Sequence, residues 1–186
     1  MKYYLVTALL LIASKITCAQ MASPDGKYTV EYFEAAAAPL ESNVKFKNAK
    51  SKKVLRYEFS SSHEEKTFQE MAWSPDSKYL AVISRGTKTS SHIRVFSFVD
   101  DKVEEVAMPS PKLGNEKSSG RYFFVKHLKW KDTKLNYYCF GNKADGAGDS
   151  DLVPNNWYHY DVTVQLSSAG KKADPKLISV VQTKPK

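Results

Sequence analysis

The chain has 186 residues, a formal net charge of +8 and only two cysteines. A chain of this length forms one domain that buries enough apolar surface to fold without disulfides. Its lysines and arginines are spread over many short stretches, such as residues 50–53 and 171–172. That pattern is typical of a solvated surface and argues against nucleic-acid binding.

The N-terminal residues 1–19 have the features of a signal peptide. Lys2 gives a positive start, and residues 3–13 form an apolar stretch that is too short to span a bilayer. Thr17 and Ala19 then place small residues at the −3 and −1 positions of a cleavage site. The pattern predicts export and cleavage, and with it a protein without an integral membrane segment.

Cleavage before Gln20 leaves residues 20–186 as a single domain of 167 residues with a net charge of +6. Cys18 leaves with the signal peptide, so Cys139 stands alone and no internal disulfide forms. Cys139 lies in an apolar run with no neighbouring histidine or arginine to activate it, which predicts a small buried side chain. We expect a periplasmic or extracellular location.

One short pattern occurs three times, as ASPDGKYTVEYF from Ala22, WSPDSKYLAVIS from Trp73 and WKDTKLNYYCF from Trp130. Its aspartates, Asp25, Asp76 and Asp132, are 51 and 56 residues apart. Pro-Asp-Gly and Pro-Asp-Ser are turn sequences, because proline presets φ and aspartate caps its own backbone. A repeat of this period predicts an array of β units. Trp73 and Trp130 are expected at equivalent buried places.

Strand-like runs follow in chain order and group into three units. The first unit has runs at 28–35, 43–48 and 54–59, after a first strand shortened by cleavage. The second has runs at 67–74, 79–85, 91–99 and 102–108, and the third at 122–130, 135–140, 157–166 and 176–183. YLAVIS is apolar on both faces, which is typical of a strand covered on both sides. VLRYEF and WYHYDVTVQL alternate, which is typical of half-exposed strands.

The SPDG-type pattern, as it stands in WSPDSKYLAVIS, resembles the repeats of TolB-like and WD-like β-propellers and of prolyl-oligopeptidase-type propeller domains. The resemblance covers all three units and weakens in the third, where Lys131 replaces proline. It implies an all-β, antiparallel repeat array of about three four-stranded units that acts as a binding platform. Since propellers close with about four to eight blades, we expect a partial propeller or a sandwich-like fold, either open or closed through an oligomer.

The sequence offers little catalytic chemistry. His63, His92, His127 and His159 are isolated and have no zinc-ligand spacing. There is no G-x-S-x-G elbow, and the hydrolase domain of prolyl-oligopeptidase-type peptidases is absent. We therefore expect no cofactor, no metal and no enzymatic activity.

The loop over residues 141–156 is the best local candidate for a contact surface. It exceeds what a hairpin requires, as does the loop over 108–120. Asp145, Asp149 and Asp151 lie among glycines, but their spacing does not match a calcium-binding EF-hand loop. Trp157 follows the loop directly, so Asp149, Asp151 and Trp157 are the predicted partner-binding residues.

The sequence supports two hypotheses for the function, which belong to different classes. The first hypothesis is a secreted or periplasmic non-catalytic module that recognises a protein partner through its inter-strand loops. A concrete version is a periplasmic inhibitor or immunity-type protein. The alternative is a hydrolase whose site is assembled from separate loops, which would require serine, histidine and an acid within hydrogen-bond reach in one pocket.

Overall fold

The computed structural model of the protein describes residues 18–34, 42–59, 68–87, 89–111, 113, 122–142, 157–169 and 172–186. Within these ranges the chain forms twelve strands and no helix. The strands form antiparallel sheets of four and eight strands, without a closed barrel or propeller. The predicted all-β repeat array is thereby confirmed.

The strands group into the three units that the sequence predicted. The first unit is β1 (Cys18–Ala22), β2 (Tyr28–Glu34), β3 (Ser42–Asn48) and β4 (Val54–Phe59). The second unit is β5 (Phe68–Trp73), β6 (Tyr79–Thr87), β7 (Ser90–Val99) and β8 (Lys102–Val106). The third unit is β9 (Phe123–Lys131), β10 (Lys134–Asn142), β11 (Trp157–Ala169) and β12 (Lys172–Gln182). Units two and three share one sheet through a single parallel bridge between Ser90 and Phe123.

Most of the predicted signal peptide, residues 1–17, lies outside the described residues. β1 pairs with β2, and Ala19 lies opposite Tyr32. The predicted cleavage point between Ala19 and Gln20 therefore falls inside β1. Cleavage there would leave Gln20, Met21 and Ala22 to pair with β2.

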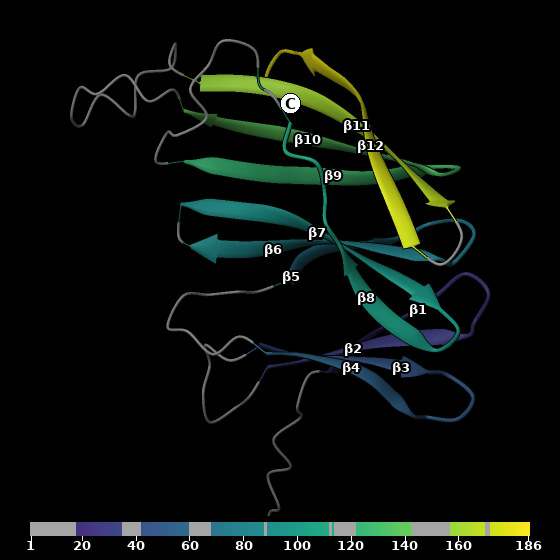
Figure 1. The fold of residues 1–186 in the computed structure, drawn as a ribbon. Coiled ribbons are helices and arrows are strands. Elements are labelled where there is room, and N and C mark those ends of the chain that lie inside the picture. Colours follow the sequence, from purple (N-terminus) through teal and green to yellow (C-terminus); the bar gives the residue numbers. More distant parts are fainter. Residues whose placement is uncertain are drawn as a thin grey trace, which may run out of the picture.

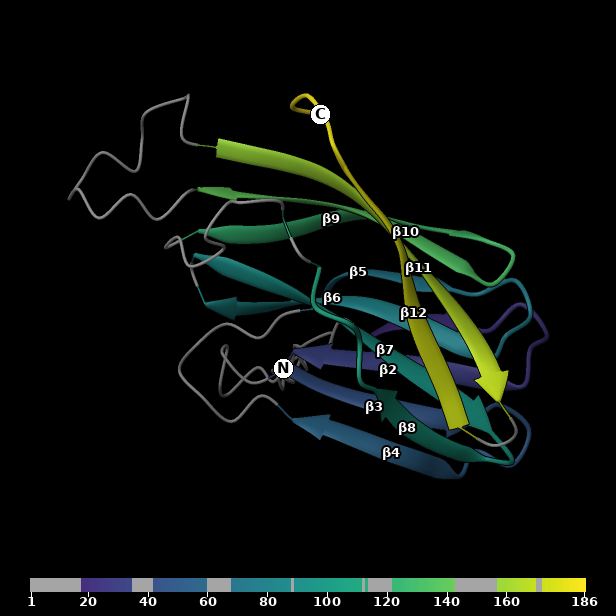
Figure 2. The same cartoon turned by 45° about the horizontal axis from the view of Figure 1, so that its top comes forward.

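The three units are stacked in chain order, from the first (purple and blue) to the third (green and yellow), as Figures 1 and 2 show. β6 lies at the centre of this stack. Its side chains Leu80 and Val82 pack in the core shared with the first unit, and Tyr79, Ala81 and Ile83 pack in the core shared with the third. All five are at most 4% exposed, which confirms the prediction of a strand covered on both sides.

The first two copies of the repeat form the same turn with the same hydrogen bonds. Ser74 Oγ donates to Asp76 Oδ1 at 2.7 Å and accepts the Tyr79 N–H at 2.9 Å. The corresponding distances around Ser23 Oγ are 2.7 Å and 3.0 Å. The residue after each aspartate has positive φ, +69° at Gly26 and +61° at Ser77. The serine hydroxyl thus accepts the tyrosine N–H, which has no backbone carbonyl partner at the turn.

The third copy forms a different turn. Lys131 and Lys134 are paired, so Asp132 and Thr133 form a two-residue hairpin loop. Asp132 has a φ of +52°, which two-residue hairpins favour because their primed turns match the strand twist. The third copy has one residue fewer between its tryptophan and its aspartate, and Lys131 alone stands where the second copy has Ser74 and Pro75, so the side-chain acceptor of that turn is absent. In this copy the strand pairing continues up to Lys131 and Lys134, directly beside the two loop residues.

The two tryptophans occupy equivalent places, but each is partly buried rather than buried. Trp73 packs on the core between units one and two, with its ring 4.7 Å from that of Phe98. Trp130 packs on the core between units two and three, and its Nε1 donates to the Ala72 carbonyl at 2.9 Å. Among the described residues, no acceptor lies within hydrogen-bond reach of Trp73 Nε1.

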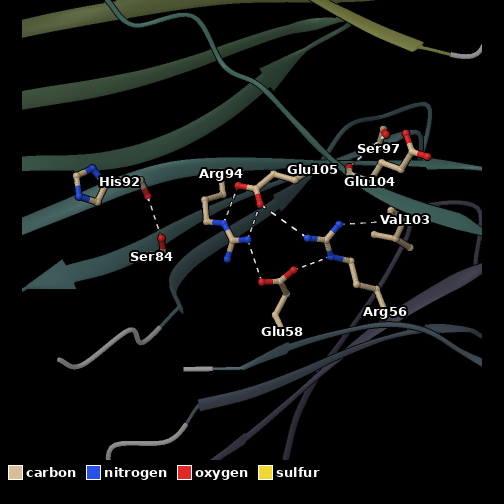
Figure 3. A network of polar contacts seen from close by, with 9 residues as sticks. All are labelled: Arg56, Glu58, Ser84, His92, Arg94, Ser97, Val103, Glu104 and Glu105. Carbon is tan, nitrogen blue, oxygen red and sulfur yellow. Dashed lines mark hydrogen bonds and ion pairs between the residues drawn. The ribbon is translucent and has the colours of Figure 1, made fainter. Parts of the chain in front are cut away.

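Charged residues join β4 of the first unit to the second unit (Figure 3). Arg94 binds Glu58 at 2.9 Å and Glu105 at 2.6 Å, and Arg56 binds Glu58 at 2.6 Å. Both guanidinium groups also lie over the Phe96 ring, at 4.9 and 5.4 Å from its centroid. A register shift in the pairing of β3 with β4 accompanies this arrangement. As a result the charged side of VLRYEF points towards the second unit, while Tyr57 is 48% exposed.

The two ends of the stack differ in chemistry. The outer face of the first unit carries Glu31, Lys45, Lys47 and Tyr57 among its described side chains. Lys47 pairs with Glu31, and Lys45 lies 5.8 Å above the Tyr57 ring. The outer face of the third unit carries a group of aromatic rings instead. The end of a repeat array needs a polar outer face, and the third unit combines exposed charges with this group of rings.

Candidate functional site

The aromatic face of the third unit consists of six rings on the side of the sheet that points away from the second unit. Alternation along β10 sends Leu135, Tyr137 and Cys139 into the core and their neighbours outwards. The same alternation operates along β11, where Tyr158 and Tyr160 are in the core. The members of the aromatic face are Tyr122, Phe124, Tyr138, Phe140, Trp157 and His159.

These rings contact one another across and along the strands. Phe140 is at the centre, with ring centroids at 5.3 Å from Phe124, 5.5 Å from Tyr138 and 6.2 Å from His159. The angle between the planes of Phe140 and His159 is 14°, and that between Phe140 and Phe124 is 27°. Because the register places Phe124, Phe140 and His159 directly opposite one another, the three rings form one cross-strand row.

Trp157 is the one predicted contact residue that the structure describes. It begins β11, is partly buried, and has its ring 6.0 Å from those of Tyr122 and Phe140. It therefore lies at the margin of the aromatic face. Asp149 and Asp151 lie outside the described residues, as does most of the loop to which they belong.

A depression of about 580 Å³ adjoins the aromatic face on the same side of the sheet. His127 lines it, at a bulge in the pairing of β9 with β10. This residue has a φ of +59°, a conformation that costs energy outside glycine. Glu70 of the second unit holds the bulge by accepting the N–H groups of His127 and Leu128 at 2.9 and 2.8 Å. Bulges of this kind re-aim side chains near binding sites.

An ion pair and a tyrosine–histidine pair border the same depression. Tyr138 Oη and His159 Nδ1 lie 2.5 Å apart. Lys186 Nζ binds Asp161 Oδ2 at 2.7 Å and lies 5.5 Å from the centroid of the Tyr138 ring. The side chains of Lys186 and Asp161 are 45% and 44% exposed, so this pair is solvated and contributes at most about 1 kcal/mol to stability.

A row of lysines follows the hairpin of β9 and β10 beside the aromatic face. Lys126, Lys129, Lys131 and Lys134, here named the lysine row, are all exposed. Within the part of the chain that the structure describes, none of them has a carboxylate partner. Lys126 Nζ lies 5.0 Å from the centroid of the Phe140 ring. The lysine row therefore joins the aromatic face directly and places four positive charges, unpaired among the described residues, beside it.

The described serine, histidine and cysteine side chains make contacts with the backbone, with tyrosine or with the core. Ser84 Oγ donates to the backbone carbonyl of His92 and not to its ring. Ser91 Oγ donates to the Val125 carbonyl, the His159 ring contacts Tyr138 Oη, and His63 lies outside the described ranges. Cys139 is fully buried, and burial, followed by the charge of Asp161, raises the pKa of its thiol to about 12. A thiol held in its neutral form is unreactive.

A second depression, of about 620 Å³, lies between the two serine-containing turns and the hairpin of β7 and β8. Its carboxylates accept hydrogen bonds within or between turns. Asp76 accepts one from the Ser74 hydroxyl, and Asp101 accepts one from the Asn48 side-chain amide at 2.9 Å. Burial raises the pKa of Asp25, but hydrogen bonds from Ser23, from the Lys27 N–H and from Ser77 outweigh this effect and lower it. Among the described residues, no three histidine, cysteine or acidic side chains are placed to hold a metal ion.

Compared with known families and with curated proteins, the chain matches no family model and no curated sequence. No helix in the described part of the chain has the length and apolar character needed to cross a membrane. Sequence reasoning singled out Trp157 but missed the other five rings. Their signal was present, because tyrosine, phenylalanine, tryptophan and histidine recur at alternate positions in Y-F-F, Y-C-F and W-Y-H.

Proposed function

We propose that this protein is a secreted or periplasmic, non-catalytic binding module that recognises a protein partner through the outer face of its third unit. The observation that carries the proposal is the pattern of β10. Like β6, β10 has large apolar side chains on both faces, but only one of its faces is covered by another sheet of the described structure (Figure 1). Five of the six rings of the aromatic face are partly exposed and Tyr138 is buried; partly exposed aromatic residues rimmed by charged ones are typical of interaction sites.

The other end of the stack supports the same proposal. Its described outer side chains include the Lys47–Glu31 ion pair and Lys45 above the single ring of Tyr57, as expected for a terminal unit that faces water. Tyrosine and tryptophan are the residues that most often contribute strongly to binding energy in interfaces. The loop with Asp149 and Asp151 leads into Trp157, so we include these residues in the proposed contact surface.

The repeat architecture belongs to the proposal as well. We infer that the three units are repeats of the TolB-like or WD-like kind, which serve as binding platforms. The matching hydrogen bonds of Ser23 and Ser74 support a common repeat. The described strands do not close into a barrel or propeller, and a partner or another copy of the chain would extend the stack at the third unit.

The experiment is capture of the native partner from envelope or culture-medium extract by the immobilised protein. Phe140→Ala and Trp157→Ala should each reduce capture at least tenfold, as expected for residues at the centre and margin of one interface. Tyr57→Ala is the matched control, since it removes an exposed ring from the opposite end of the stack. Equal capture by all three variants would contradict the proposed surface. Turnover of a hydrolase substrate panel by the purified protein would contradict the non-catalytic function.

A further inference from the structure

We infer that the partner presents an extended acidic segment with carboxylates at alternate positions, and that the lysine row binds it. The inference rests on the proposed function, because it assigns a chemistry to the partner of the same face. The lysine row consists of four exposed cations without a carboxylate partner among the described residues. Lysines on the outer face of the first unit, by contrast, pair with Glu31 or lie over Tyr57.

The arrangement of the lysines is not explained by folding. Lys131 and Lys134 lie directly opposite each other in the ladder. Like charges at opposite positions of an antiparallel pair destabilise it. A hairpin loop of this type accepts many flanking residues, so the repulsion between these two lysines is not required by the turn. Binding of an anion would relieve it.

The spacing of the lysines defines the ligand. Lys129 and Lys131 are two residues apart on the same face of β9, which places them about 6.6–6.8 Å apart along the strand. Carboxylates at alternate positions of an extended peptide have the same repeat. Lys126 continues the row to Phe140. A segment with alternating acidic residues followed by an apolar residue would therefore reach the lysine row and the aromatic face together.

The state of the rings favours a polypeptide over a nucleic acid. Single-stranded nucleic acids bind by stacking bases on exposed aromatic faces. Here Phe140 has the Lys126 ammonium above its ring, and Tyr138, which is 3% exposed, has that of Lys186. Each of these rings also packs against its neighbours. The lysine ammonium groups are thus presented to a ligand more than the ring faces are, which suits carboxylates.

The test measures binding of fluorescent peptides to the purified protein by anisotropy, with amide chemical shifts to locate the site. We expect the acetylated peptide ESESESEF to bind and to shift the amides of β9 and β10. Its isomer EEEESSSF should bind at least threefold more weakly, and KSKSKSKF should not bind. Raising sodium chloride from 50 to 200 mM should weaken binding severalfold, because exposed charges are screened.

Variants assign the effect to the lysine row. Lys129→Glu combined with Lys131→Glu should weaken ESESESEF binding roughly tenfold or more, because attraction is replaced by repulsion. Lys50→Glu combined with Lys53→Glu, two exposed lysines of the first unit, should bind as the unmodified protein does. Urea titration of both double variants establishes that they are folded.

Three outcomes would overturn the inference: no binding of ESESESEF, equal binding of the two glutamate isomers, or tighter binding of a fifteen-nucleotide oligothymidylate than of either peptide. The proposed function is tested separately. If Trp157→Ala loses the native partner while the Lys129→Glu, Lys131→Glu variant keeps it, the binding face stands and the acidic ligand is wrong.

Discussion

Ser74→Ala tests whether the serine hydroxyl of the repeat is what closes its turn. Ser74 is 0% exposed, and its Oγ donates to Asp76 and accepts the N–H of Tyr79. Alanine removes both interactions with almost no change in volume. The N–H of Tyr79 is then left without its acceptor in a buried position, whereas the Asp76 carboxylate, 38% exposed, can still be hydrated.

The magnitude follows from these two consequences. A buried donor left without a partner costs about 1–3 kcal/mol, and the hydroxyl–carboxylate bond contributes about 1 kcal/mol more. We therefore expect Ser74→Ala to lower the free energy of unfolding by about 2–4 kcal/mol. Ser23→Ala should cost the same within about 1 kcal/mol, because Ser23 makes the corresponding two bonds with Asp25 and Tyr28.

Urea unfolding followed by tryptophan fluorescence and circular dichroism measures both values. Ser97→Ala is the matched control, since the Ser97 hydroxyl makes one exposed bond to the Glu104 carbonyl at 3.3 Å, and its loss should cost under about 0.5 kcal/mol. If Ser74→Ala costs no more than Ser97→Ala, the hydroxyl does not hold the turn. A cost at Ser74 without one at Ser23 would refute the equivalence of the two units.

Three further changes address packing and ionisation. Trp130→Phe should lower the free energy of unfolding by about 1 kcal/mol more than Trp73→Phe does. Only Trp130 loses an indole hydrogen bond among the described contacts. Equal urea midpoints of the two variants would contradict this. Gly141→Ala should destabilise by about 1–3 kcal/mol in the same assay, since the added Cβ would lie 2.3 Å from the Tyr122 carbonyl oxygen, and unchanged stability would show that the backbone yields easily. Burial, and then the charge of Asp161, raises the pKa of the Cys139 thiol to about 12. The stabilisation that the neutral thiol gives the folded state is therefore complete below the unfolded pKa of about 8.5 and is lost as pH rises towards 12. Between pH 9 and 11 the free energy of unfolding should therefore fall less steeply in Cys139→Ala, by up to about 1.4 kcal/mol per pH unit, and parallel curves would contradict the shift.

The unit boundaries could be predicted because they are encoded locally. Serine, proline and aspartate define the two matching turns through bonds within six residues of one another. Alternation along β11 identified its core side, and Tyr158, Tyr160, Val162, Val164 and Leu166 are all buried as predicted. The two-sided apolar pattern of β6 correctly placed it between two layers. Each of these features depends on residues that are close in sequence.

The local sequence did not predict which side of β4 faces the second unit. Alternation in VLRYEF separates an apolar from a charged side, and simple partitioning would bury the apolar one. Instead Arg56 and Glu58 face the second unit, where Arg94 and Glu105 supply partners (Figure 3). Burial of a charge is tolerated when it is paired. The partners are 36 or more residues away in sequence, so no local pattern indicates them.

The sequence by itself determined the class of the fold, the three units and the chemistry of the first two turns, because turn geometry and side-chain alternation are set by neighbouring residues. Only the tertiary structure decided which of the two strands lies between two sheets of the described part of the chain. β6 and β10 both carry large apolar side chains on each face, yet β6 lies between two layers and β10 lies in the third unit. Coverage by another sheet depends on how the units pack on one another, which no single strand encodes. The aromatic face and the adjoining lysine row therefore become a recognisable surface only once the strands of the third unit are placed side by side.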